Sequence, residues 1–269
     1  MFFGVNPTPG YFTDSSFVAM PHFGFGGAIL GGNAEYLVGE TGDPDPLDGS
    51  YIPRVTLWDF TGTAYRVSGL SGARRFARAV AMSGTGFYVG HTRDYAANPS
   101  RPQGFVGHGL EAQILTYPGF TVLRATDVND NGWVIGAWTP DDATDLAFVG
   151  RATGTDARDL GVLLGYPEVY AQGINNWGAI VGAASLGVTF DVALYWKPGA
   201  TEPIDLNTLV SIPGEPRLVE AMDINNAGQI LARGFNGYYI LTPVPEPSAF
   251  ALVGLGVIAC ATRRTRRSE

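Results

Sequence analysis

A twelve-residue motif recurs five times along this chain, and it constrains the fold more than any other feature. Three copies align without gaps, at residues 125–136 (ATDVNDNGWVIG), 171–182 (AQGINNWGAIVG) and 221–232 (AMDINNAGQILA). Weaker copies occupy residues 28–39 and 79–90. Successive copies start 46 to 51 residues apart, a period that suits four strands joined by three turns. The repeat therefore predicts an all-β fold, a β-propeller of about five four-stranded blades.

Each copy of the motif is typical of a β-hairpin. A small residue and an Ile or Val form the incoming strand, and an apolar pair such as Ile180 and Val181 begins the outgoing one. The turn between these strands is rich in Asn and Gly, as in the copy that contains Asn175, Asn176 and Gly178. We expect the chain to turn there because Asn tolerates left-handed φ and Gly adopts it without strain.

The rest of each period predicts two more strands. The next strand is aromatic or aliphatic, and four examples are residues 55–58, 114–117, 146–149 and 193–196. A last element carries Asp-Leu-Gly or Asp-Leu-Asn, as at residues 159–161 and 205–207. No segment of the body shows a sustained helical period.

Both ends of the body are expected to meet in one blade. Residues 238–242 form a strand of the fifth blade, and a strand near residues 17–20 completes that blade and closes the ring. A sixth blade or a different closure stays open if the true start lies upstream. The predicted organisation is an N-terminal segment at 1–25, the propeller at 26–242 and a C-terminal sorting segment with a short hydrophobic helix at 243–269.

Charge and cysteine content limit the possible partners of the body. Up to Val244 the chain has 13 basic and 23 acidic side chains, a net charge near −10. Such a surface disfavours nucleic acid and anionic lipid, and it suits divalent cations or neutral glycans. The single cysteine, Cys260, lies outside the body. The body therefore depends on its core and its hydrogen bonds rather than on disulfides.

The C-terminal 25 residues have three parts in a fixed order. Pro245, Glu246 and Pro247 come first, then an apolar segment at residues 249–261, then four arginines: Arg263, Arg264, Arg266 and Arg267. The prolines predict an extended boundary accessible to a protease. Thirteen apolar residues are fewer than the ~20 of a stable membrane span. The arginines predict a cytoplasmic C-terminus with the body in the periplasm; the alternative is a buried C-terminal helix of a soluble domain.

This order resembles the PEP-CTERM sorting signal of exopolysaccharide-producing Gram-negative bacteria. The resemblance implies an exosortase-type membrane protease as partner, transient anchoring through the C-terminal helix, and a location in the cell envelope or outside the cell. The N-terminus, MFFGVNP, shows no signal peptide. Two explanations stay open: a start assigned too late, or a product that never leaves the cytoplasm.

The body also resembles the HAF-repeat family of predicted extracellular proteins. That family combines an Ala-Phe strand, Asp-Leu-Gly-x-Leu and Ile-Asn-x-x-Gly-x-Val-Val-Gly. Residues 147–148, 159–163 and 174–182 carry the whole pattern once. The family's usual His before Ala-Phe is Leu146 here, so no histidine role transfers. The family has no common established activity, so the resemblance implies a fold and an exported location only.

One turn has the beginning of a calcium loop. Asp127, Asn129 and Asn131 precede Gly132 in the Asp-x-Asn-x-Asn-Gly order, but the twelfth loop position is Trp138 rather than the Glu that an EF-hand uses. A plain hairpin turn is the preferred interpretation, with calcium as the alternative. A second acidic loop at residues 43–48 is interpreted as a solvated turn.

Other residue types that often serve in active sites are isolated in the sequence. His22, His91 and His108 show no metal-ligand spacing and are predicted to be surface or loop residues. The glycine-rich stretch at residues 24–32 lacks the Lys of a phosphate-binding loop. We therefore predict no catalytic, cofactor-binding or metal-binding residues.

The five tryptophans divide into two predicted groups. Trp58 and Trp196 are expected in the core. Trp133 and Trp177 lie in or beside hairpin turns and are candidates for exposed stacking platforms.

Three functions are consistent with these observations. The first is an exported, non-enzymatic repeat protein of the envelope or the exopolysaccharide matrix. The second is a secreted polysaccharide hydrolase or lyase, which would need carboxylates converging in one pocket. The third is a lectin-like glycan-binding module, which would need exposed tryptophans on repeated loops.

Overall fold

The computed structural model describes residues 10–12, 17–19, 25–45, 47–70, 75–94, 101–140, 144–187, 189–210 and 217–244. The regular structure of these residues is β-strand, apart from one 3-10 turn, η1 (Leu206–Thr208). The described part contains no helix with the length and apolar character needed to span a membrane. The helix expected in the C-terminal sorting segment lies outside the described residues.

Five antiparallel sheets follow one another along the chain. The first comprises β3 (Phe25–Gly32), β4 (Tyr36–Pro44), β5 (Tyr51–Asp59) and β6 (Ala64–Arg66). The second comprises β7 (Arg75–Met82), β8 (Phe87–Asp94), β9 (Pro102–His108) and β10 (Glu111–Ile114). The third comprises β11 (Thr121–Val128), β12 (Trp133–Thr139), β13 (Leu146–Arg151) and β14 (Arg158–Asp159). The fourth comprises β15 (Glu168–Ile174), β16 (Ile180–Ser185), β17 (Phe190–Trp196) and β18 (Ile204–Asp205), and the fifth has β19 (Leu218–Ile224), β20 (Ile230–Gly234) and β21 (Gly237–Leu241).

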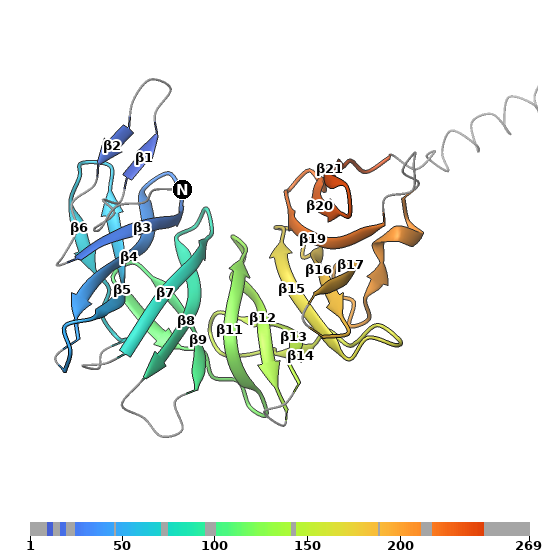
Figure 1. Ribbon diagram of the computed structural model, residues 1–269, viewed down its shortest axis with the longest axis horizontal. Coiled ribbons are helices and arrows are strands. Elements are labelled where there is room, and N and C mark those ends of the chain that lie inside the picture. Colours follow the sequence, from blue (N-terminus) through green and yellow to red (C-terminus); the bar gives the residue numbers. More distant parts are fainter. Residues whose placement is uncertain are drawn as a thin grey trace, which may run out of the picture.

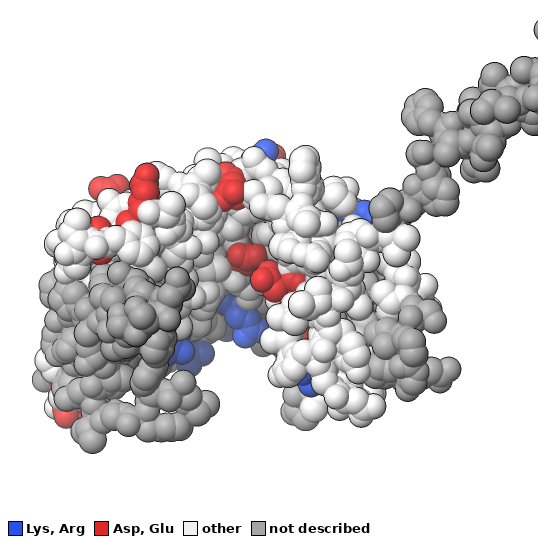
Figure 2. Space-filling model, turned by 90° about the horizontal axis from the view of Figure 1, so that it is seen from above, with Lys and Arg blue, Asp and Glu red and all other residues white. Residues whose placement is uncertain are grey.

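The sheets are arranged around an arc (Figure 1). The first strands of neighbouring sheets adjoin, β3 with β7, β7 with β11, β11 with β15 and β15 with β19, so these strands line the inside of the arc. Figure 2 shows the hollow that they enclose and the opening between the two ends. The prediction of five repeated antiparallel sheets is confirmed. A closed ring of four-stranded blades is not, because the arc is open and the described part of the fifth sheet has three strands.

An N-terminal hairpin replaces the predicted ring closure. β2 (Phe17–Ala19) pairs with β1 (Gly10–Phe12) in a separate two-stranded sheet, and β1 contacts β3. The prediction that this strand completes the fifth blade is therefore wrong. Pairing with a strand only a few residues away closes a short loop, which costs less chain entropy than joining the two ends of the body.

Two details of the predicted period are also wrong. Residues 114–117 were expected to form the third strand of the second sheet, yet β10, which ends at Ile114, is its fourth strand and β9 is the third. The sequence of β9, PQGFVGH, contains a proline and two glycines that weaken its strand pattern. The first copy of the motif is also shifted by one residue. In the second sheet the motif alanine, Ala79, pairs with Gly90, but in the first sheet Ile29 rather than Ala28 pairs with Gly39.

A β-bulge recurs in every first strand and explains a glycine of the motif. The extra, unpaired residues are Leu30, Val80, Thr126, Gln172 and Met222. Opposite the bulge of the fourth sheet, Gly182 pairs with Ala171, and a Cβ on Gly182 would lie 1.8 Å from the Tyr170 carbonyl oxygen. This glycine is required for space rather than for a turn.

The hairpin turns use Asn and Gly in different ways. Gly132, Gly178 and Gly228 have φ of +71°, +82° and +78°, as predicted, whereas Asp156 is the one non-glycine described with positive φ. Left-handed Asn is therefore a wrong prediction. Instead, the side-chain oxygen of Asn175 accepts from the backbone N–H groups of Trp177 (3.1 Å) and Ala179 (3.0 Å), an Asx turn.

The same asparagines join neighbouring sheets. The Nδ2 group of Asn129 donates to the Asn175 carbonyl oxygen at 2.9 Å, and that of Asn175 donates to the Asn225 carbonyl oxygen at 3.2 Å. Successive turns of the last three sheets are thus connected by hydrogen bonds.

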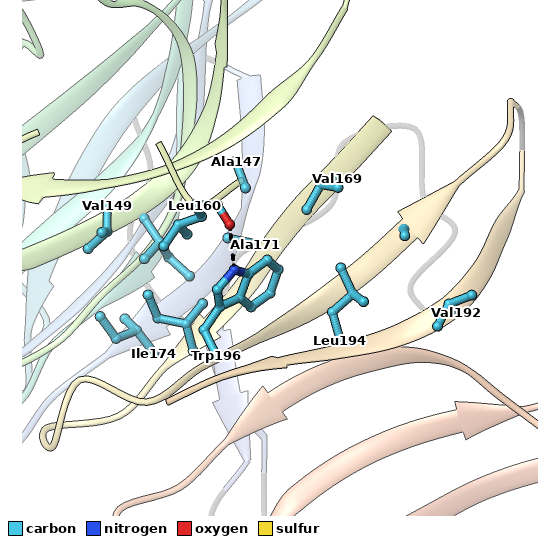
Figure 3. Packing of buried hydrophobic residues seen from close by; sticks show 12 residues of the cluster. Ala147, Val149, Leu160, Val169, Ala171, Ile174, Val192, Leu194 and Trp196 are labelled. Atoms are coloured by element: carbon cyan, nitrogen blue, oxygen red, sulfur yellow. Dashed lines mark hydrogen bonds between the residues drawn. The ribbon is translucent and has the colours of Figure 1, made fainter. Parts of the chain in front are cut away.

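Hydrophobic cores fill the spaces between sheets. Figure 3 shows the core between the third and fourth sheets, where Trp196 is fully buried and its Nε1 donates to the Leu160 carbonyl oxygen at 2.7 Å. Trp58 is also fully buried, so the predicted core position of both tryptophans is confirmed.

Candidate functional site: the concave groove

The inside of the arc is lined by two residues from each first strand. One residue precedes the motif alanine, and the other is the bulged residue that follows it. In the second to fifth sheets these pairs are Arg78 and Val80, Arg124 and Thr126, Tyr170 and Gln172, and Glu220 and Met222. The repeat thus places different side chains at equivalent positions of one surface.

Two pockets on this surface share His91 and Arg124. One, of about 380 Å³, is lined by both rows, including Gln172 and Tyr170. The other, of about 440 Å³, extends past Phe76 and Asp145. Acidic and basic side chains are visible inside the hollow in Figure 2. We refer to the two pockets together as the concave groove.

Three carboxylates, Asp145 in the groove and Glu40 and Glu220 beside it, pair with cationic side chains. Arg78 donates to both oxygens of Glu40, at 2.7 Å each. Arg124 pairs with Asp145 at 3.1 Å. Glu220 accepts from Arg233 at 2.7 Å and from the Gln172 amide at 2.8 Å.

Aromatic rings lie between these pairs. Tyr170 packs against Phe190 with ring centroids 5.4 Å apart, and the Arg124 guanidinium lies 5.7 Å from the centre of the Tyr170 ring. Burial, together with the hydrogen bond that Tyr170 donates to Glu168, raises the pKa of Tyr170 to about 12. Tyr170 is therefore a neutral hydrogen-bonding aromatic at physiological pH.

His91 stacks on Phe76 at a centroid distance of 5.5 Å. Burial, followed by the nearby charges of Arg78 and Arg124, lowers its pKa, so its imidazole is neutral at pH 7. The prediction of a surface or loop histidine is wrong for His91, which belongs to β8 and is half-buried in the groove.

The pairing of these carboxyl groups bears on the alternative of a polysaccharide-cleaving enzyme. A glycosidase needs two carboxyl groups facing one bond, one of them held protonated. The carboxyl groups of Glu40, Asp145 and Glu220 each accept from an arginine instead. The carboxyl group of Asp127 has its pKa raised to about 7, because it is buried between the third and fourth sheets.

The candidate calcium loop uses its oxygens for backbone hydrogen bonds. Asp127 accepts from the N–H groups of Val128 (2.8 Å) and Ile174 (2.9 Å). The side-chain oxygen of Asn129 accepts from Asn131 and Trp133. Among the described residues, no group of three His, Cys, Asp or Glu side chains is placed to hold a metal. Calcium binding at this turn stays a prediction.

The other candidate residues do not converge. In the acidic loop, Asp43 pairs with Arg54 and Arg66, and Asp45 accepts from the backbone of Leu47. His108 contacts the Thr85 carbonyl oxygen at 3.3 Å. Much of the glycine-rich stretch is strand β3, and His22 lies outside the described residues.

The two candidate platform tryptophans differ. Trp177 is 73% exposed, with its Nε1 donating to the Asn226 carbonyl oxygen. Trp133 is half-buried, and the Arg151 guanidinium lies 4.0 Å from its ring centre. Of the two, only Trp177 is exposed, and its role as a stacking platform stays a prediction.

Sequence reasoning missed the groove residues. The position before the motif alanine holds Arg78, Arg124, Tyr170 and Glu220 in successive repeats. The available signal was a position that varies among polar residues while the rest of the motif repeats. Equivalent positions of all repeats face one shared surface, so different side chains there can combine into one site.

The predicted sorting signal lies outside the described residues: Pro245, Glu246, Pro247, Arg263, Arg264, Arg266 and Arg267.

A family model, the PEP-CTERM protein-sorting motif, matches residues 243–267. The match indicates an exported, envelope-associated protein that exosortase processes in the membrane, which agrees with the interpretation of the tail. A search of curated proteins found no match.

Among solved structures, the crystal structure of TolB from Acinetobacter baumannii is similar over 61% of this chain, with 13% identity and a TM-score of 0.40. The match spans 38% of that protein, and a similarity this weak supports no functional argument.

Proposed function

We propose that this chain is a non-enzymatic, HAF-type repeat protein of the envelope or the exopolysaccharide matrix, and that its concave groove binds polysaccharide. The observation that carries the proposal is the composition of the groove. Tyr170, Phe190 and His91 offer flat faces for sugar rings, and Arg124 and Gln172 offer hydrogen-bond donors beside them.

The pairing of the carboxylates supports a binding role. An acid catalyst must hold or release a proton during the reaction, whereas Glu40 and Glu220 each accept two hydrogen bonds from neighbouring side chains. The sorting motif at residues 243–267 supports a place beside the polysaccharide.

Binding to purified exopolysaccharide of the host, measured by titration calorimetry with dextran as the neutral comparison polymer, tests the proposal. We expect Tyr170→Ala and Phe190→Ala to weaken binding about tenfold each, or about 1.4 kcal/mol. The matched control is Trp177→Ala, which removes the exposed aromatic outside the groove. If only Trp177→Ala lost binding, the polysaccharide site would lie at the hairpin turns rather than in the groove. If the parent protein did not bind, the proposal would be refuted.

The same mixtures separate the binding role from the enzyme alternative. A binding protein leaves the polymer length unchanged. New reducing ends, or the absorbance of unsaturated sugars, would show a hydrolase or a lyase instead.

A further inference from the structure

One face of the fifth sheet is exposed, whereas the equivalent face of each of the other four sheets is covered by the next sheet. On the second strands, Val38, Val89, Ile135 and Val181 are 0% exposed, and the equivalent residue of the fifth sheet, Leu231, is 38% exposed. On the third strands, Leu57, Val106 and Val149 are 1–4% exposed and Tyr195 is half-buried, whereas the equivalent Ile240 is 71% exposed. These positions are equivalent by pairing, as in Val38 with Leu57 and Leu231 with Ile240.

Tyr238 extends this exposed surface. It is 67% exposed, whereas the equivalent Val55 and Ala147 are 3% and 0% exposed. Leu231, Tyr238 and Ile240 form what we call the bare face. In the first four sheets the same positions pack against the next sheet, so the bare face has the composition of an interior contact.

The first sheet does not cover the bare face. In a closed ring it would offer the surface that contains Thr56 and Trp58, the equivalents of Leu194 and Trp196 in the fourth sheet. Thr56 and Trp58 are already fully buried while the bare face is exposed. Another segment must therefore cover it if it is covered at all.

We propose that the apolar segment of the tail, residues 249–261, docks on the bare face while the chain is in water. The first reason is its place in the chain. In the fourth sheet, β18 begins at Ile204, eight residues after Trp196, which pairs with Ile180. Leu241 has the place of Trp196, since it pairs with Ile230, and the apolar segment begins eight residues after it. It thus starts where a fourth strand would begin, beside β21, whose Tyr238 and Ile240 belong to the bare face.

Reach and charge give the second and third reasons. Val244, which is 86% exposed, precedes the segment by five residues, and five extended residues span about 17 Å. That distance exceeds the width of a three-stranded sheet, whose strands are about 4.8 Å apart. Asp223 lies exposed beside Leu231, its pairing partner, and complements the four arginines that end the tail.

Docking and membrane insertion would use the same thirteen residues, so they would exclude each other. The body would then shield the apolar segment from water until a membrane takes it up. This inference goes beyond the binding role of the groove and does not depend on it.

Disulfide trapping tests the proposal, because Cys260 is the only cysteine and lies in the docking segment. In the full chain, without detergent, mild oxidation of Tyr238→Cys or Ile240→Cys should give a disulfide within the monomer. The control is Leu186→Cys, a similarly exposed position at 64% in the loop after β16, which should form little of this disulfide. Vesicles of neutral phospholipid should reduce trapping at Ile240→Cys.

Three results would overturn the proposal. The first is no monomer disulfide at either bare-face position. The second is trapping of Leu186→Cys as fast as Ile240→Cys. The third is a disulfide-linked dimer of Ile240→Cys in a Cys260→Ser background, which would show that a second copy covers the face.

Discussion

Asp127 lies between the third and fourth sheets, where its carboxyl accepts from one backbone N–H of each. Burial nevertheless dominates and raises its pKa to about 7, above the value near 3.8 of an unfolded chain. The folded state therefore favours the protonated carboxyl. Its contribution to stability is full below pH ~4 and is lost as the pH rises to about 7.

This pKa predicts a pH dependence that Asp127→Asn removes. The parent should lose up to about 1.4 kcal/mol of unfolding free energy per pH unit between pH ~4 and ~7 relative to the variant. Urea denaturation at a series of pH values measures the difference. Asp156→Asn, at an exposed position, is the control and should follow the parent. Parallel profiles for Asp127→Asn and the parent would contradict the assignment.

At the scale of elements, most strands could be predicted from the sequence, but the structural roles of individual residues within them could not. The twelve-residue motif gave the hairpins correctly because alternation and turn chemistry are local. It did not reveal the first-strand bulge, because an unpaired residue such as Gln172 looks like any other residue of a strand. The glycine opposite the bulge was consequently not given its true role.

The bulge predicts a large effect of a small substitution. Gly182→Ala would place a methyl group against the Tyr170 carbonyl oxygen and should destabilise the protein by about 3 kcal/mol. Gly187→Ala, at a glycine with open space around it, should change stability by less than about 0.5 kcal/mol. In the fifth sheet the equivalent residue is Ala232, so the prediction concerns the sheets that have glycine at this position. Thermal denaturation of both variants checks the prediction, and equal melting temperatures would refute it.

At the scale of the whole molecule, the repeat number was predictable and the closure was not. Closure depends on whether two surfaces far apart in the chain meet, and no local pattern reports this. The groove escaped sequence reasoning for a related reason, since Arg78, Arg124 and Tyr170 combine into one surface only once their strands adjoin.

The open arc predicts a gradient of local stability. Each sheet packs mainly on its immediate neighbours, so the unit at an end has one supporting interface and an internal unit has two. Amide hydrogen exchange should be slowest in β12 and β16 and faster in the equivalent strand β20. Uniform exchange across the five sheets would show that the arc opens only as a whole.

The bare end of the arc also bears on how such a chain can change over generations. A ring fixes its number of units, because an added unit must force two existing neighbours apart. Here a duplicated segment of 46 to 51 residues inserted after Leu241 would find an apolar sheet face ready to receive it and would disturb none of the four buried interfaces. Gene duplication could therefore lengthen the groove one unit at a time, with a new side chain added to its lining at each step.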